Sequence, residues 1–106
     1  MSILKKYQVA LELLDKDKIE ECIHDDYAFT NYSQGKVFNK TEVVQWAMTG
    51  DVKREKIRIL FENDEVGVEH AFVSFNDGYT LAVLGFYTFK DGKIHSVVTG
   101  ATNITK

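Results

Sequence analysis

The chain has 106 residues, of which 44% are hydrophobic and 27% are charged, and its formal net charge is −3 at pH 7. This length predicts a single domain over residues 1–106. The negative net charge argues against binding to a phosphate backbone, which needs clustered Lys and Arg, so we expect no nucleic-acid partner. The apolar runs fall short of the ~18 residues of a membrane span, so we expect no membrane partner either.

Two features bear on the cellular compartment. The single cysteine, Cys22, rules out an intramolecular disulfide. Near the start of the chain, Glu12 and Asp15 interrupt the apolar pattern that follows Lys5 and Lys6, so an uninterrupted signal-peptide core is missing. We therefore expect the protein to stay in the cytoplasm.

Two helices are predicted at the start of the chain. Residues 3–14 place apolar side chains at helical spacing, which predicts an amphipathic helix. A second, short helix is predicted to begin at Asp17, because Asp17 and Glu20 have the form of a capping box, and to end near His24.

A small hairpin and a third helix are predicted next. Residues 27–32 alternate in the manner of a strand, and residues 33–36 supply a turn. Asn39 and Glu42 repeat the capping-box signal, so a third helix is predicted to begin there and to stop at Gly50.

The apolar pattern of the second half has a period of two. It predicts four strands, over residues 57–61, 66–72, 80–89 and 94–104. Asp77-Gly78 and Asp91-Gly92 are predicted as two-residue hairpin turns, since glycine accepts the positive φ that such turns demand. The four strands should therefore form an antiparallel meander. A basic cluster lies where the first of these strands begins, and we expect it to form a solvated surface. It consists of Lys53, Arg54, Lys56 and Arg58.

Helices in the first half and an antiparallel sheet in the second define an α+β fold with the helices on one sheet face. The strand at residues 80–89 is apolar on both faces, because alternate side chains of a strand point to opposite sides. The helices can cover one face, and we expect another protein chain to cover the second.

Three segments carry a family resemblance. They are Leu13-Leu14-Asp15-Lys16-Asp17-Lys18-Ile19-Glu20 leading to Asp25-Asp26-Tyr27, then Asn39-Lys40-Thr41-Glu42-Val43, then Tyr87-Thr88-Phe89-Lys90-Asp91-Gly92-Lys93-Ile94. In this order they resemble the NTF2-like superfamily, which includes SnoaL-like cyclases and ketosteroid isomerase-like proteins. The resemblance implies an NTF2-like cone, in which three N-terminal helices pack on a curved, mostly antiparallel sheet around a pocket. It also implies a dimer formed through the outer sheet face.

The same resemblance argues against the isomerase chemistry. Matching the chain to the isomerase-like pattern places Asn31 where those enzymes carry a carboxylate base, Gly85 where they carry a protonated acid, and Ala10 where they carry a tyrosine. An amide cannot abstract a proton near neutral pH. We therefore expect the container to be retained without that mechanism.

The matching also directs side chains into the pocket. Because Glu69 prefers solvent, its neighbour His70 should point inward, where it is the candidate catalytic group; the alternative is a core histidine satisfied by a neighbour. An apolar pocket with a few polar groups is typical of small-molecule sites, so the expected ligand is an apolar small molecule. The expected ligand contacts are Phe29, Asn31, Trp46, Phe72, Val83, Gly85, Tyr87, His95 and Thr99.

The opposite face of the sheet predicts a homodimer. An apolar patch of several hundred Å² is unusual on a monomer, so a second copy is expected to cover it. The patch is predicted to consist of Ala71, Val73, Phe75, Ala82, Leu84, Phe86 and Val98.

No sequence motif indicates a metal or a cofactor. The three histidines lack the local spacing of metal ligands, and neither a glycine-rich phosphate loop nor a nucleophile elbow occurs, so we expect neither group. Three functions stay open. They are an enzyme of the isomerase, cyclase or dehydratase type, a non-catalytic binder of an apolar metabolite, and a pure association domain.

Overall fold

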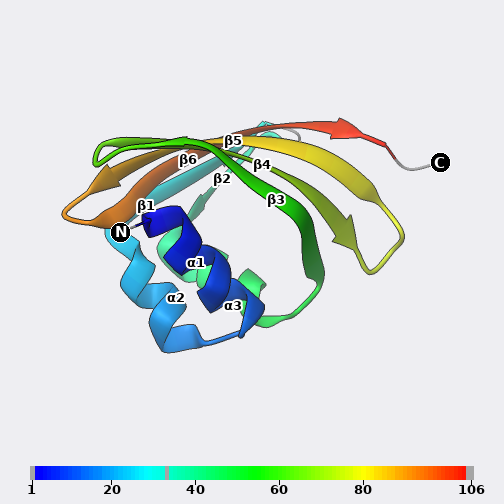
Figure 1. Ribbon diagram of the computed structural model, residues 1–106. Helices are drawn as coiled ribbons and strands as arrows, with labels where there is room; N and C mark the ends of the chain where they lie inside the picture. The colour runs from blue at the N-terminus through cyan, green and yellow to red at the C-terminus, as the bar shows by residue number, and fades with distance from the viewer. Residues whose placement is uncertain (1, 33, 105–106) are drawn as a thin grey trace.

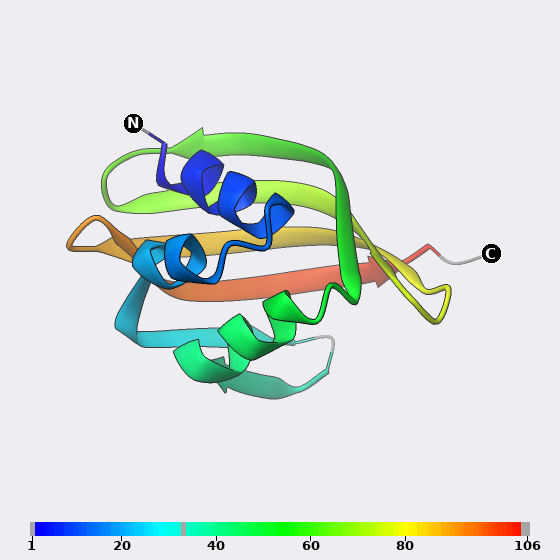
Figure 2. The ribbon, with the colours of Figure 1, turned by 90° about the horizontal axis from the view of Figure 1, so that it is seen from below.

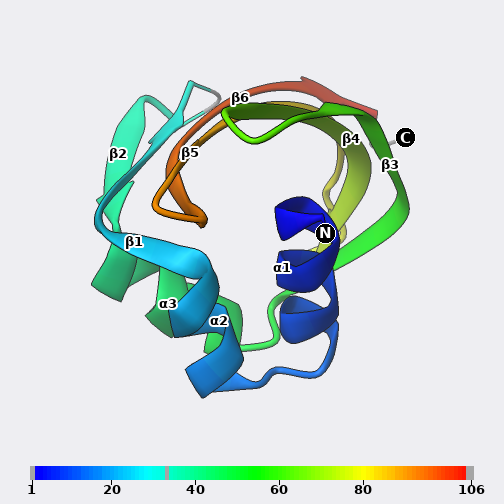
Figure 3. The same cartoon turned by 60° about the vertical axis from the view of Figure 1, so that its left-hand side comes forward.

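The protein is a curved sheet with helices on its concave side. The computed structural model describes residues 2–32 and 34–104, which contain three helices and six strands. The sheet arches over the helices in Figure 1 and curls around them in Figure 3. No helix in these ranges is long and apolar enough to cross a membrane. The elements are α1 (Ile3–Glu12), α2 (Lys16–Cys22), β1 (Ile23–Asn31), β2 (Lys36–Asn39), α3 (Lys40–Met48), β3 (Val52–Glu62), β4 (Val66–Phe75), β5 (Thr80–Lys90) and β6 (Lys93–Asn103).

All of these strands belong to one sheet, in the order β2-β1-β6-β5-β4-β3. Strands β3 to β6 form the predicted antiparallel meander, and β1 and β2 form the predicted hairpin. The parallel pairing of β1 with β6 joins the two parts, and the sequence did not predict it (Figure 2). The α+β class is therefore confirmed. The grouping of three helices at the N-terminus is only partly right, because β1 and β2 lie between α2 and α3.

The ends of α2 and α3 follow local hydrogen bonding. Asn39 and Glu42 form the predicted capping box at the start of α3. The predicted cap of α2 was wrong, because Asp15 and not Asp17 occupies the N-cap position. The turn predicted between β1 and β2 includes Ser33, which lies outside the described residues.

Strand β3 is longer than predicted and contains a bulge. It begins at Val52 rather than at Ile57, and its pairing with β4 shifts near Lys56, which has a φ of 52°. A bulge re-aims the side chains around it. As a result, Arg54 and Ile57 both line the concave face. The predicted solvated surface was therefore wrong for Arg54, whose side chain is only 20% exposed.

The two later hairpin turns differ by one residue in length. Lys90 pairs with Lys93, so Asp91-Gly92 is a two-residue turn as predicted. The turn between β4 and β5 is longer, because the N–H of Phe75 donates to the carbonyl of Tyr79 at 2.9 Å and residues 76–78 form the loop. This extra residue sets which side chains of β4 face the helices.

Helix α1 is held close against the sheet. At its start, Glu62 of β3 accepts hydrogen bonds from Ser2 Oγ at 2.6 Å and from the N–H of Ile3 at 2.7 Å. Further along, the helix approaches β4 at Gly67, where an added Cβ would lie 2.8 Å from Leu4 Cδ1. The absence of a side chain at Gly67 is therefore part of the packing of α1.

We predict that Gly67→Ala destabilises the protein by about 1–3 kcal/mol, the usual cost of overpacking a core. The new methyl group would also lie 3.0 Å from the Phe89 ring, so the side chains of Leu4 and Phe89 have to move. Urea unfolding measures the effect. Gly100→Ala is the control, because its Cβ would meet nothing within 4 Å. Equal stability of the two variants would contradict the prediction.

Candidate functional site

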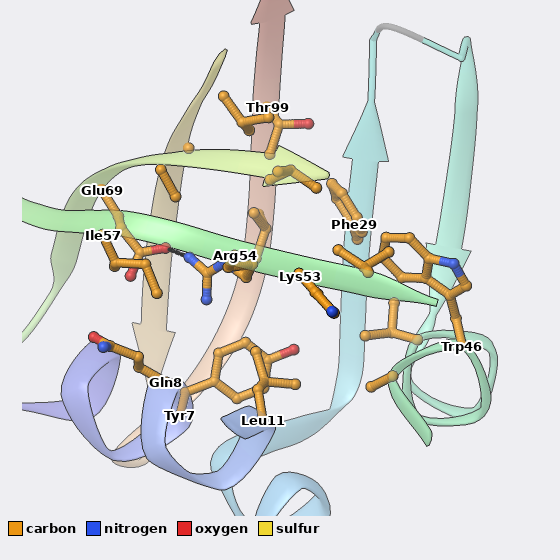
Figure 4. Close-up of a pocket in the computed structure, with 18 of the residues that line it drawn as sticks. Tyr7, Gln8, Leu11, Phe29, Trp46, Lys53, Arg54, Ile57, Glu69 and Thr99 are labelled. Carbon is orange, nitrogen blue, oxygen red and sulfur yellow. Dashed lines mark hydrogen bonds and ion pairs between the residues drawn. The ribbon is translucent and has the colours of Figure 1, made fainter. Parts of the chain in front are cut away.

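A cavity of about 570 Å³ lies between the concave face of the sheet and the helices. Figure 4 shows side chains from α1, α3 and several strands around it. Most of the wall is apolar, including Leu11 of α1 and Val97 of β6, and Trp46 of α3 is 41% exposed. This size and composition are typical of sites for small organic molecules.

Seven of the side chains predicted to contact a ligand line this cavity. The prediction of which β5 residues face inward was correct, since Val83, Gly85 and Tyr87 all lie on the concave side. Their contact with a ligand stays a prediction. The seven are Phe29, Asn31, Trp46, Val83, Gly85, Tyr87 and Thr99.

The orientation predicted for β4 was wrong by one residue. Glu69, expected in solvent, is 4% exposed and lines the cavity. His70, expected to be the catalytic group, and Phe72, expected to contact the ligand, lie on the convex face instead, where His70 pairs with the exposed Leu84. The physical cause is the longer turn before β5, because a slip of one residue moves every side chain to the other face.

The same correction applies to the predicted outer patch. Ala71, Val73 and Phe75 line the cavity and do not belong to the convex face. Pairing of Phe72 with Ala82 places the even-numbered residues of β4 beside the remaining members of that patch. Those members are Ala82, Leu84, Phe86 and Val98.

His95 was also predicted to contact the ligand, and it is not among the cavity-lining residues. Its ring packs edge-on against the ring of His24, with 5.1 Å between the centroids. An irregularity in the pairing of β1 with β6 next to His95 changes the direction of the side chains there. The sequence contains no local signal for this irregularity.

The polar centre of the cavity is an ion pair that the sequence did not predict. Arg54 Nη2 of β3 donates to Glu69 Oε1 of β4, and the Tyr87 hydroxyl of β5 donates to the same oxygen at 3.0 Å. Figure 4 draws the contact between the guanidinium and the carboxylate, with Tyr7 and Gln8 of α1 below it. These three neighbouring strands thus bring together a cation, an anion and a hydroxyl inside an apolar wall.

The ionisation of this cluster follows from its burial and its charges. Burial alone would lower the pKa of Arg54, but Tyr87, Glu69 and Tyr7 outweigh that effect and raise it, so the guanidinium stays charged. Burial raises the pKa of Tyr7 to about 12, and it also raises the pKa values of Tyr27 and Tyr87. At neutral pH the three phenols are therefore protonated and can donate hydrogen bonds.

A signal for this cluster was present in the sequence but was not decisive. The residues on both sides of Glu69 in β4 are apolar at odd and at even positions, so the pattern fits either orientation. Counting from the loop at residues 76–78 pairs Glu69 with Gly85, which fixes the carboxylate on the cavity side. The deciding information was the length of that loop.

Comparison with known proteins supports the fold. No family model and no curated protein matches the sequence. Among solved structures, an NTF2-like protein of unknown function from Cytophaga hutchinsonii ATCC 33406 superimposes with a TM-score of 0.80 at 14% identity, over 94% of this chain and 87% of that one. A "putative ketosteroid isomerase" from Kribbella flavida DSM 17836 has a TM-score of 0.78 at 11% identity, over 98% and 78%. A "putative polyketide cyclase" from Sinorhizobium meliloti has a TM-score of 0.75 at 19% identity, over 92% and 93%.

These likenesses show a class of fold, a curved sheet with helices on its concave side. The chain has the NTF2-like fold, as its sequence predicted. At these identities, the comparisons show the fold alone. The activity has to be argued from the residues in the cavity.

We predict that the Arg54–Glu69 pair behaves as a coupled unit in stability. Glu69→Gln leaves the buried guanidinium without its counter-charge, which should cost about 3–5 kcal/mol. The double variant with Arg54→Met removes both charges and should lose less stability than the two single variants together. Urea unfolding of all four proteins measures the coupling.

If the losses of unfolding free energy in the two single variants add up to the loss in the double variant, Arg54 and Glu69 do not stabilise each other and the prediction is wrong. The control cycle uses Glu65→Gln and Arg58→Met, since both side chains are exposed. Each of these changes should stay within about 0.5 kcal/mol.

Proposed function

We propose that the protein binds an apolar small molecule in the cavity of the NTF2-like fold. The observation that supports this most directly is an apolar enclosure of about 570 Å³ that contains a charged pair. A purely structural core gains nothing from a cavity, because unfilled volume costs stability. A ligand in this space would supply the packing contacts that the atoms of the cavity wall lack.

The charged cluster indicates one polar feature of the ligand. A guanidinium has five N–H donors, and the pair with Glu69 uses only part of this capacity. The protonated Tyr7 and Tyr27 add further donors to the cavity wall. An oxygen acceptor such as a carbonyl or hydroxyl on an otherwise apolar skeleton therefore fits this site.

We predict that Val83→Phe blocks binding, because it places a ring in the cavity. The probe is anilinonaphthalene sulfonate, whose uptake is measured by energy transfer from Trp46, the single tryptophan of the chain and a part of the cavity wall. Binding should weaken at least about tenfold, the effect of roughly 1.4 kcal/mol.

The matched control is Leu84→Phe. This neighbouring residue of β5 is 49% exposed on the convex face, so the same ring is added outside the cavity. Equal probe binding by the two variants, with both still folded, would contradict a binding site on the concave side.

An enzyme of the isomerase, cyclase or dehydratase type is a second candidate. It is favoured by one observation, a carboxylate that faces the cavity, because such reactions need a group that moves a proton. Glu69, and not His70, is in position for that role. The wild type should then incorporate deuterium from solvent into a bound enolisable ketone, and Glu69→Gln should bind the ketone without exchange. Equal exchange by both proteins would contradict this role.

We also propose that the protein is a homodimer through its convex sheet face. Leu84 and Phe86 of β5 are 49% and 45% exposed there, and Val98 of β6 pairs with Phe86 and is 36% exposed. On the same face, His70 Nδ1 is buried without a hydrogen-bond partner among the described residues. A group of exposed apolar side chains next to a buried polar atom is suited to closure by a second copy.

We predict that Phe86→Asp converts a dimer to a monomer, because it introduces a charge at the centre of the proposed interface. Sedimentation at micromolar concentration measures the mass. Leu13→Asp is the control, since Leu13 is 63% exposed but lies on the connection between α1 and α2. A monomeric wild-type protein would remove the support for this interface.

A further inference from the structure

A second group of polar side chains lies outside the cavity, where β1 meets β6. It consists of His24, Asp26 and His95, and one potential ligand atom from each residue lies within 4.8 Å of the others. None of the three lines the cavity. We propose that these residues bind a divalent transition-metal ion of the zinc class, with Asp91 as the residue that orients His24.

The irregular pairing of β1 with β6 builds this group. Ile23 pairs with Ile94 and Ala28 pairs with Ser96, so residues 24–27 of β1 lie opposite His95 alone. His24 and Asp26 therefore both lie beside His95. Figure 2 shows the start of β1, coloured cyan, at the same end of the sheet as the β5–β6 turn, coloured orange.

Asp25 lies between the two proposed ligands of β1, and its side chain is paired with a different residue. Asp25 forms an ion pair with Lys40 at 3.1 Å. Asp25 therefore compensates the nearby lysine, while the carboxylate of Asp26 is exposed and can turn toward the two imidazoles.

The hydrogen bonds of His24 define the lone pair that can bind a metal. The backbone N–H of Asp26 donates to His24 Nδ1 at 3.0 Å, so in the neutral ring Nδ1 carries the lone pair and Nε2 carries the hydrogen. A metal ion bound at Nδ1 takes the place of this backbone N–H. Nε2 faces Asp91 Oδ2 at 3.5 Å. A metal-binding histidine characteristically directs its second ring N–H to a carboxylate, which fixes the tautomer and the ring orientation.

The chemistry of the donors indicates the class of ion. Two imidazole nitrogens with a carboxylate oxygen suit Zn²⁺, Cu²⁺ or Ni²⁺, whereas Mg²⁺ and Ca²⁺ prefer oxygen ligands alone. In a tetrahedral zinc site, ligand atoms ~2.0–2.1 Å from the metal lie about 3.4 Å apart. The ligand atoms now lie within 4.8 Å of one another, so they need to approach by up to about 1.4 Å, and the exposed Asp26 has room to do so. The fourth position stays open to water.

The rings of the two histidines lie next to each other. Their centroids are 5.1 Å apart and their planes are inclined by 86°. The sequence prediction of no metal rested on local spacing, which cannot detect His24 and His95 on different strands. Only the pairing of β1 with β6 places them side by side.

Calorimetric titration of the tag-free 106-residue chain with ZnCl₂ tests the proposal. We expect one Zn²⁺ per chain, and we expect His95→Gln to weaken binding by more than the roughly 10- to 100-fold that loss of an orienting residue costs. Asp91→Asn should weaken binding within that range. His70→Gln is the matched control, because it removes the remaining histidine of the chain, which lies on another part of the sheet.

Thermal unfolding provides a second readout, since an ion that binds only the folded state raises the melting temperature. Zn²⁺ should stabilise the wild type and His70→Gln but not Asp26→Asn. The last variant changes an exposed side chain, so it tests the site even if His95→Gln fails to fold. The proposal is overturned if the wild type shows no saturable Zn²⁺ binding, or if Asp26→Asn and His95→Gln bind as tightly as the wild type.

Discussion

The buried carboxylate of Glu69 constrains the rest of this structure. A carboxylate that leaves water for an apolar cavity is costly unless an opposite charge and further hydrogen bonds compensate it. Here Arg54 comes from the strand on one side and Tyr87 from the strand on the other. The registers of β3, β4 and β5 are therefore interdependent, because a slip of any one strand would separate the charge from its partners.

This constraint divides the sheet into two surfaces with different proposed uses. Once Glu69 faces the helices, Ala71 and Val73 also face inward, and the cavity acquires an apolar wall around one charged pair. The convex face then carries His70 and Phe72 beside the exposed side chains of β5. The concave face thus has the features of a ligand site, and the convex face has those of an association surface. Each proposal depends on the same strand register.

Sequence reasoning succeeded where the deciding interactions are local. The capping box of Asn39 and Glu42 lies within one helical turn, and the two-residue turn at Asp91-Gly92 depends on the backbone of those residues, whose φ values are 55° and 73°. The alternation in β5 identified Val83, Gly85 and Tyr87 as cavity residues. The alternation did not fix the orientation of β4, because both faces of that strand are apolar. The partners that allow the Glu69 carboxylate to face inward lie on other strands.

The sequence by itself determined the α+β class, the meander of β3 to β6 and the two-faced character of β5, because propensity, periodicity and turn chemistry act over a few residues. The tertiary structure decided which face of β4 looks inward and which distant side chains meet. Arg54 and Glu69 come together across two strands, and His24 and His95 meet only because β1 pairs in parallel with β6. The physical reason is the same in both cases. Strand register depends on single residues in loops and bulges, and burial of a charge depends on partners far away in the chain.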